Sequence, residues 1–518
     1  MKHTNWLKVL RVILAILFFC PILLFFVDIT HKLPLQIHGL LHTQLIPAVL
    51  SGMFIGVTVL ILLTWLFGRI YCSVICPAGI LQDMINRFFC IGRKKKNGVF
   101  RFRYHKPFNW LRYVLLAVVC GFAIFGWTEL CLLLDPYSNF GRIAANLFRP
   151  VVIWGNNLLA GALNSMGNFS LYHITITNIT TVSLISSGVA LLVFIIMAVW
   201  RGRLFCNTLC PVGGILSVFS RFSLFRISIK DSCGQCRACE RACKAEAINI
   251  KDKSVDMSRC VNCFNCLSTC KKDAINFKPF FLKEKLATET VKSSAPENNS
   301  RRTFIATGVA VAASLPVAAL NAKQNALTGS EKEEFLPVTP PGSINLERFK
   351  EKCTACHLCV TKCPSHVLRP AGLEYGFRYL LKPRMDYLDS YCNYECTICS
   401  EVCPTKAIET ITSEEKKTVQ VGIARFYKDR CIVHTEENDC GACSEHCPTQ
   451  AVHMVPYKGT LTIPQVEPEL CVGCGGCESI CPVRPDRAII IIANKEHLQA
   501  EKPKEEEKMK VDVDEFGF

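Results

Sequence analysis

The chain has 518 residues, of which 50% are hydrophobic and only 20% are charged. Soluble proteins usually carry about 25% charged residues, so this composition excludes wholesale disorder and argues against a purely soluble enzyme. The net charge of +16 resembles that of a nucleic-acid binder, but membrane proteins also gather Lys and Arg in their cytoplasmic loops. The 32 cysteines stand in tight, repeated groups, which indicates metal centres and not a disulfide framework.

Four apolar stretches are long enough for membrane-spanning helices, which need about 20 residues each. They cover residues 7–27, 44–67, 108–130 and 180–200. The second and fourth stretches contain no charged residue, so buried helices of a soluble core are a poor alternative. The sequence therefore predicts a membrane domain of four helices over residues 1–225.

The distribution of basic residues predicts the orientation of these helices. Lys and Arg crowd residues 68–107, whereas the loops on the other side hold only Lys32, Arg142 and Arg149. Because strongly basic loops stay in the cytoplasm, we expect the N-terminus, this basic loop and residues 201–300 on that side.

A fifth apolar segment has the features of an export signal. The pair Arg301-Arg302 opens an Ala-rich run that ends at Ala322. Twin-arginine signals export folded cargo, as an iron–sulfur domain requires, because its clusters are inserted in the cytoplasm. We expect a linker and signal over residues 283–322, an exported domain over 323–495 and a charged tail over 496–518.

The chain contains an internal repeat at the ends of the second and fourth apolar stretches. Residues 68–79, GRIYCSVICPAG, align without a gap with residues 202–213, GRLFCNTLCPVG. Two helix pairs therefore look like copies related by an axis along the membrane normal. The repeats bring together four cysteines that would hold a metal centre, form a reactive dithiol pair or only shape the loops: Cys72, Cys76, Cys206 and Cys210.

Six further cysteine motifs have the C-x2-C-x2-C-x3-C spacing of bacterial ferredoxins, although some of their gaps are wider. In that pattern three thiolates on a tight turn bind one 4Fe-4S cluster, and the fourth binds the cluster of a sister motif. The predicted cytoplasmic domain, residues 226–282, carries two of them: Cys233, Cys236, Cys239, Cys243 and Cys260, Cys263, Cys266, Cys270. By the exchange rule Cys270 completes the first set and Cys243 the second. Residues 247–250 between the motifs are expected to form a strand of a small α+β ferredoxin fold.

The predicted exported domain carries four motifs, each followed by proline. They are Cys353, Cys356, Cys359, Cys363; Cys392, Cys396, Cys399, Cys403; Cys431, Cys440, Cys443, Cys447; and Cys471, Cys474, Cys477, Cys481. The first gap of the third motif is eight residues long, so Cys431 is expected to approach from a loop. We expect a nested pairing, in which the first motif pairs with the fourth and the second with the third.

Three other kinds of site compete for these cysteines. Zinc also takes four thiolates, but its ribbons use two CxxC pairs separated by a long loop, which these motifs do not resemble. Disulfides are disfavoured by the same tight spacing. Cys353, Cys356 and His357 match the c-type haem attachment pattern, but they lie inside a complete cluster motif.

The motifs together resemble two families in tandem. Residues 1–280 are similar to NapH, the membrane ferredoxin-type subunit of periplasmic nitrate reductase systems, in their four apolar stretches, two CxxxCP loops and two cluster motifs. Residues 300–495 resemble the NapG/MauM proteins, which are exported by the twin-arginine translocase and carry four clusters. The fusion itself, Lys244 and Lys271 in place of proline, and the widened third motif depart from those families.

The resemblance implies a membrane-bound quinol dehydrogenase of anaerobic respiration. It would hold six 4Fe-4S clusters and no flavin, take electrons from the quinone pool, and deliver them to a periplasmic nitrate- or nitrite-type reductase or its cytochrome. About 30 Å of hydrocarbon would separate the clusters on the two faces, and a quinone suits that gap. The candidates for the quinone site are His38, His42 and Glu129.

Two other functions remain open from the sequence. A cytoplasmic ferredoxin-type donor would feed a transmembrane conduit that enters at the clusters of residues 233–270. An accessory factor would instead supply electrons or metal while an exported redox enzyme matures. No phosphate-binding or dinucleotide-binding glycine motif is present, which disfavours oxidation of NAD(P)H by this chain alone.

Overall fold

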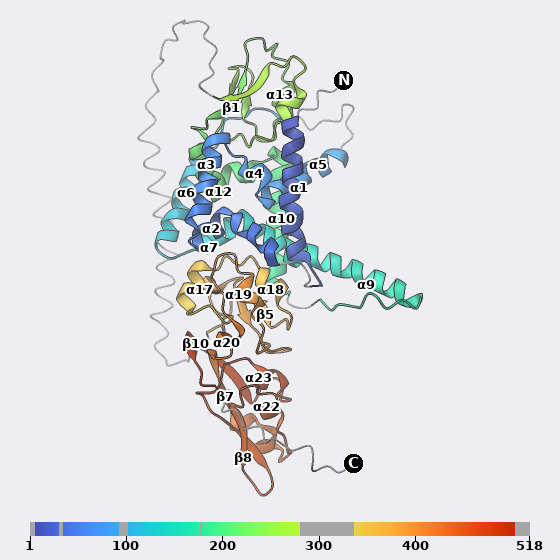
Figure 1. The fold of residues 1–518 in the computed structure, drawn as a ribbon, viewed down its shortest axis with the longest axis vertical. Coiled ribbons are helices and arrows are strands. Elements are labelled where there is room, and N and C mark those ends of the chain that lie inside the picture. The colour runs from blue at the N-terminus through green and yellow to red at the C-terminus, as the bar shows by residue number, and fades with distance from the viewer. Residues whose placement is uncertain (1–5, 31–34, 93–101, 177–178, 280–335, 503–518) are drawn as a thin grey trace, which may run out of the picture.

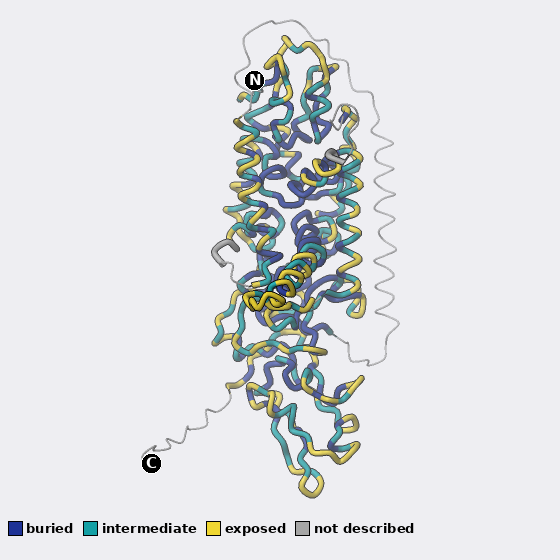
Figure 2. Tube along the Cα trace, turned by 90° about the vertical axis from the view of Figure 1, so that its right-hand side faces the viewer, coloured by how far each residue is buried: buried dark blue, intermediate teal, exposed yellow. Residues whose placement is uncertain are grey.

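The computed structural model describes residues 6–30, 35–92, 102–176, 179–279 and 336–502. The predicted linker and twin-arginine signal lie outside these described residues. The molecule is elongated, with a helical body in the middle and small cysteine-rich domains at its two ends (Figure 1). Buried residues form a column along its length (Figure 2).

Two helices in the described part of the chain are long and apolar enough to cross a membrane. They are α1 (Trp6–Val27) and α10 (Thr181–Arg201). Both expose large apolar side chains, such as Ile13 on α1 and Ile185 on α10. These helices agree with the first and fourth predicted spans.

The second and third predicted spans are interrupted, so the expectation of four unbroken helices is wrong. Residues 44–67 form α2 (Leu45–Leu50) and α3 (Phe54–Phe67), separated by a turn at Gly52. Residues 108–130 form α6 (Asn109–Ile124), a turn at Gly126 and the start of α7 (Glu129–Leu134). Both glycines have positive φ, 75° and 74°, a conformation that ends a helix.

The remaining helices of the body are short or unexpected. The repeats form α4 (Tyr71–Val74) with α5 (Pro77–Gly92), and α11 (Leu204–Thr208) with α12 (Pro211–Ser220). A 3-10 helix, η1 (Leu35–Thr43), precedes α2. A continuous rod consists of α8 (Pro136–Ile143), the π-helical segment η2 (Ala144–Phe148) and α9 (Arg149–Ser165). This region is expected to be a loop between the third and fourth apolar stretches, but it is helical, and α9 projects sideways from the body (Figure 1).

The first cysteine-rich domain has the expected ferredoxin-like form. Strand β1 (Phe225–Ile229) pairs antiparallel with β4 (Ile275–Pro279), and β2 (Ile248–Asn249) pairs with β3 (Ser254–Val255). Helices α13 (Ala238–Ala242) and α14 (Asn265–Thr269) follow the two cysteine turns. Strand β2 lies within the predicted strand 247–250.

The second cysteine-rich domain, at the other end of the molecule, is built from three two-stranded antiparallel sheets. These pair β5 (Leu368–Pro370) with β6 (Pro383–Met385), β7 (Val419–Phe426) with β10 (Ile489–Gln499), and β8 (Val452–Pro456) with β9 (Thr462–Val466). Its helices are short: α17 (Leu346–Lys352), α18 (Leu358–Lys362), α19 (Ile398–Glu401), α20 (Ser413–Lys416), α21 (Ile432–Thr435), α22 (Ala442–Glu445) and α23 (Gly476–Ile480). Because β10 continues to Gln499, the predicted domain end at residue 495 is too early.

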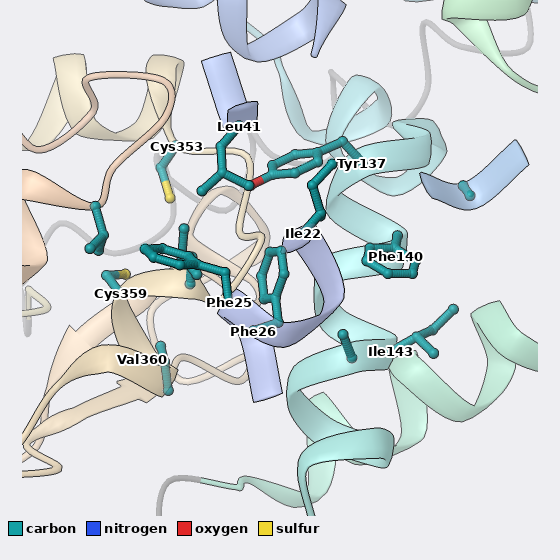
Figure 3. Close-up of a cluster of buried hydrophobic side chains, with 14 of the residues drawn as sticks. Ile22, Phe25, Phe26, Leu41, Tyr137, Phe140, Ile143, Cys353, Cys359 and Val360 are labelled. Atoms are coloured by element: carbon teal, nitrogen blue, oxygen red, sulfur yellow. The ribbon is translucent and has the colours of Figure 1, made fainter. Parts of the chain in front are cut away.

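The apolar core continues from the helical body into this second domain. Phe25 and Phe26 of α1 belong to the same buried cluster as Tyr137, Cys353 and Cys359. Figure 3 shows the Phe25 ring directed from α1 toward Cys359, and the Phe26 ring between Phe25 and Phe140 of α8. The first motif of the second domain is therefore packed directly on the ends of α1 and α8.

Candidate iron–sulfur sites

The cysteine turns with two-residue gaps share one backbone shape. In each, the residues on both sides of the middle cysteine have positive φ: Gln235 and Arg237, Asn262 and Phe264, Ala355 and His357, Gly473 and Gly475. Alternating left-handed residues turn successive backbone N–H groups toward one point and form a concave anion site. An iron–sulfur cluster with its thiolates carries negative charge, so this backbone fits it.

In the first domain, one set of thiols gathers as the exchange rule predicts. The Cys243 thiol lies near Cys260, Cys263 and Cys266. Burial, and after it the neighbouring Cys263, raises the pKa of Cys243 to about 11. These four residues would hold one cluster, and Cys270 stays the predicted fourth ligand of the other.

In the second domain, neighbouring motifs pair, and the predicted nesting is wrong. Cys403 of the second motif lines a cavity with the first three cysteines of the first motif, Cys353, Cys356 and Cys359. In return, Cys363 lies beside Cys392 and Cys399. The β5–β6 hairpin joins the two motifs and folds one back on the other.

The third and fourth motifs exchange their last cysteines in the same way. Cys481 lines a cavity with Cys431, Cys440 and Cys443. Cys447 lies beside the remaining set, which consists of Cys471, Cys474 and Cys477. Cys431 lies directly after the short helix η4 (Lys428–Arg430) and before α21. It therefore approaches the site from outside the turn that carries Cys440 and Cys443, as expected.

Burial keeps these thiols neutral unless a metal binds. It raises the pKa of Cys353, Cys443 and Cys474 to about 12 in each case. A metal deprotonates the thiols that bind it, so iron would supply the charge that stabilises the thiolates. Among the described residues, no three Cys, His, Asp or Glu side chains converge on a single metal ion. A 4Fe-4S cluster has a wider cage, because each thiolate binds a different iron.

The histidine of the haem-like pattern is already engaged by the protein. His357 is 1% exposed, its Nδ1 lies 3.2 Å from Asn146 Nδ2, and its Nε2 lies 2.9 Å from the Leu381 carbonyl oxygen. Burial lowers its pKa to about 3, so the ring is neutral. Both ring nitrogens have protein partners, which argues against an axial haem ligand at this position.

The two CxxxCP loops meet in the core, as the repeat predicts, and bind each other reciprocally. The Arg69 guanidinium donates to the Cys206 carbonyl over 2.8 Å, and Arg203 donates to the Cys72 carbonyl over 2.6 Å. Cys72, Cys76, Cys206 and Cys210 are all buried in the same apolar core. Because all four side chains are buried in one apolar core, the cysteines have a packing role. Their metal or redox role stays a prediction.

Buried ion pairs clamp the second domain onto the helical body. Lys362 of α18 lies 2.7 Å from Asp28, with both side chains about 5% exposed, and Lys382 lies 3.5 Å from Glu129. Glu129, a predicted quinone-site residue, thus has a structural partner. His42 is half-buried on η1, and the side chain of His38 lies outside the described residues. The three predicted quinone-site residues do not converge on one described pocket.

Families of iron–sulfur domains match most of the cysteine-bearing segments. A family described as a 4Fe-4S binding domain matches residues 50–97 and 184–230, which contain the CxxxCP repeats. Families described as 4Fe-4S dicluster domains match residues 256–367, 352–408 and 438–484. The range 352–408 contains the first and second motifs of the second domain, and the range 438–484 contains most of the third and fourth. This division agrees with the pairing of neighbouring motifs in the structure.

Whole-protein comparisons give relatives at modest identity. An uncharacterised protein of Methanocaldococcus jannaschii is 28% identical over 49% of this chain and 89% of its own length. The ferredoxin-type protein NapG of Escherichia coli is 28% identical over 36% of this chain and 84% of its own length. The methylamine utilization ferredoxin-type protein MauN of Paracoccus denitrificans is 27% identical over 38% of this chain and 54% of its own length. No solved structure matches the chain. The chain is an iron–sulfur electron-transfer protein related to the Nap and Mau ferredoxin-type proteins.

Proposed function

We propose that this protein is a membrane-bound quinol dehydrogenase that passes electrons through 4Fe-4S clusters to a periplasmic reductase of the nitrate or nitrite type. The observation that carries the proposal is the contact between the first motif of the second domain and the helical body. Gly141 of α8 packs so closely on this motif that an added Cβ would lie 2.6 Å from the Cys356 carbonyl oxygen. Tyr137 also lies near Cys356 and Cys403.

The same proposal assigns the two parts of the chain to a fused NapH-like and NapG-like protein. The helices α1, α3, α6 and α10 would cross the cytoplasmic membrane, with the domain of residues 225–279 inside and the second domain outside. The shorter α3 and α6, with 14 and 16 residues, would span with help from the adjoining helices and turns. The twin-arginine translocase would export the second domain with its clusters.

The chain's own residues would hold and seal the electron-transfer sites. The four thiolate sets of the second domain and the two of the first would each bind one cluster, and each bound cluster would carry one electron at a time. The Lys362–Asp28 and Lys382–Glu129 pairs would keep the first of these sites against the helical body. The aromatic rings of Phe25, Phe26 and Tyr137 would exclude water from that contact.

Electron paramagnetic resonance on anaerobic membranes that contain the protein tests this function. We expect menadiol to produce reduced-cluster signals, and dithionite to increase them. In a Cys353→Ala variant the menadiol-dependent signal should fall, whereas a Cys120→Ser variant, at an exposed cysteine outside the motifs, should behave like the parent protein.

Signals with dithionite alone would contradict quinol oxidation. Reduction by a cytoplasmic ferredoxin or flavodoxin without quinol would favour the conduit instead. An accessory role would be indicated if the partner reductase stayed inactive even with artificial electron donors.

A further inference from the structure

Helix α9 (Arg149–Ser165) leaves the body at the ends of the two long apolar helices. Its first residue, Arg149, interacts electrostatically with Asp28, which directly follows α1. Asn146, in the π-helical segment that precedes α9, donates from Nδ2 to Ser187 Oγ in the second turn of α10 over 2.9 Å. Figure 1 shows α1 along the long axis of the molecule and α9 across it, and in Figure 2 α9 is strongly foreshortened. Helix α9 therefore lies across the proposed membrane spans, level with the end of α1 and the start of α10.

One face of α9 is apolar and exposed. Side chains that recur three or four residues apart along an α-helix share one face. Five apolar side chains with this spacing are each 43–66% exposed: Val151, Val152, Trp154, Leu158 and Leu159. A contiguous apolar surface of this kind marks a contact with a membrane or with another protein.

The opposite face of α9 is covered by the chain that returns toward α10. Asn157 exchanges two hydrogen bonds of 2.9 Å with the backbone of Ile174, and Asn156 donates to the Tyr172 carbonyl oxygen over 3.0 Å. Ile153, one helical turn before Asn157, is buried on this side. Figure 1 shows the returning chain on the side of α9 that is nearer to the second domain. The exposed apolar face is therefore directed the other way, toward the level of α1 and α10.

The composition of this region selects a lipid surface as the partner of α9. Residues 150–180 contain no Asp, Glu, Lys or Arg, whereas charged groups steer the association of soluble protein partners. Trp and Tyr are enriched at membrane–water interfaces, and Trp154 and Tyr172 are both exposed here. Leu24, near the end of α1, and Ile185, near the start of α10, are exposed apolar residues as well. A bilayer would cover all of these side chains together.

We propose that α9 is an interfacial membrane helix, which lies in the outer headgroup region with its apolar face toward the acyl chains. The inference rests on the proposed function, which places α1 and α10 across the membrane, and adds to it the level at which the bilayer ends. Asn146, just before α9, has its Nδ2 3.2 Å from His357 Nδ1 in the first cluster turn of the second domain. The first cluster site is therefore held at the level of the lipid headgroups, next to the bilayer that would contain the quinol.

Photolabelling of the protein by lipid tests the position of α9. The full-length, cluster-loaded protein is placed in nanodiscs of phosphatidylcholine that carries a diazirine on its acyl chain. After irradiation and chymotryptic digestion, mass spectrometry locates the adducts. We expect adducts within residues 151–159, as well as on α1 and α10, and none on Leu498, an exposed residue of β10 in the second domain.

Two variants of the same helix separate its faces. Leu158→Glu should lower the yield of adducts on α9 about threefold or more, because a carboxylate disfavours burial among acyl chains. Asn164→Glu, at an exposed position on the opposite face of α9, should leave the yield unchanged. Iron content and the dithionite-reduced spectrum show whether each variant is folded.

Adducts on α1 and α10 but none on α9 of the parent protein would overturn the inference, while leaving the membrane spans of the proposed function in place. Equal yields from Leu158→Glu and Asn164→Glu would also overturn it. If α9 is unlabelled and Leu158→Glu converts a dimer into monomers, the inference is overturned in favour of a second copy of the chain. Absence of adducts from α1 and α10 as well would contradict the membrane location, and with it the proposed function itself.

Discussion

Single residues in the CxxxCP repeats show how closely the two copies are packed. Gly79 and Gly213 occupy equivalent positions, and a Cβ on either would overlap the carbonyl oxygen of Cys72 or Cys206, respectively. Arg203 and Arg69 bind those same two carbonyls from the opposite repeat. Only glycine fits at these two positions, because any side chain would overlap a carbonyl oxygen that is already held by an arginine of the other repeat.

We expect Gly79→Ala to lower the thermal stability of the protein. The added methyl group meets backbone that cannot rotate away, and overpacking of this kind costs about 1–3 kcal/mol. Gly188→Ala is the matched control, because it lies in α10 with no atom within 4 Å of its added Cβ. The melting temperature in detergent, followed by intrinsic fluorescence, should fall only for Gly79→Ala, and an unchanged value would contradict the packing of the repeats.

At the scale of the elements, α18 is attached to α1 by charge as well as by apolar contact. The Lys362 ammonium lies 2.7 Å from Asp28 and 4.4 Å from the centre of the Phe25 ring. A buried pair of this kind is costly to break on one side, because the remaining charge stays in the interior. The contact thus selects one docked position for the first cluster motif.

Lys362→Met should destabilise the docked domain by about 3–5 kcal/mol, since Asp28 would be left buried without its cation. Adding Asp28→Asn to the same variant should recover part of that loss, which a double-mutant cycle with denaturant midpoints would measure. Lys458→Met, which removes an exposed pair with Glu437, should change the midpoint little. Equal effects of the two lysine variants would contradict the clamp.

Helix α9 is an element that the sequence pattern does not reveal. Its Asn156 and Asn157 side chains bind the carbonyls of Tyr172 and Ile174, so the polar face is covered by the returning chain. Trp154 and Leu158 remain more than 60% exposed. Glycines and asparagines favour a loop in this region, but proline at the first turn, in Arg149-Pro150, is a helix-start signal.

At the scale of the whole molecule, the pairing of cluster motifs decides the order of the electron-transfer sites. Because neighbouring cysteine motifs pair, the second domain consists of two ferredoxin-like units in series. One unit, with Cys353 to Cys403, contacts the helical body, and the other lies toward the far end of the molecule (Figure 1). Electrons from the body would therefore reach the far unit through the near one.

Cys403→Ala should release the three other thiols of the near site, because its fourth ligand is lost. Alkylation by iodoacetamide, read by mass spectrometry on the anaerobic native protein, should then label Cys353, Cys356 and Cys359. Cys481→Ala should instead expose Cys431, Cys440 and Cys443. Labelling of Cys353 in the Cys481→Ala variant would restore the nested pairing and contradict the structure.

Local spacing by itself determined the iron–sulfur chemistry of this protein. Three cysteines two residues apart produce the same left-handed turn wherever they occur, and the fourth cysteine follows at a short fixed distance. The hydrophobic runs of α1 and α10 and the CxxxCP repeat are likewise local patterns. All of these depend on neighbours in the chain, so the sequence specifies them directly.

Only the tertiary structure decided which sets of cysteines meet and what lies between the domains. The fourth ligand of each set comes from another motif, and a hairpin of ordinary sequence chooses which one. Asn146 of η2 stands in no motif, yet its Nδ2 lies 3.2 Å from His357 Nδ1 in the first cluster turn of the second domain. Contacts between distant segments depend on packing, and spacing along the chain does not encode them.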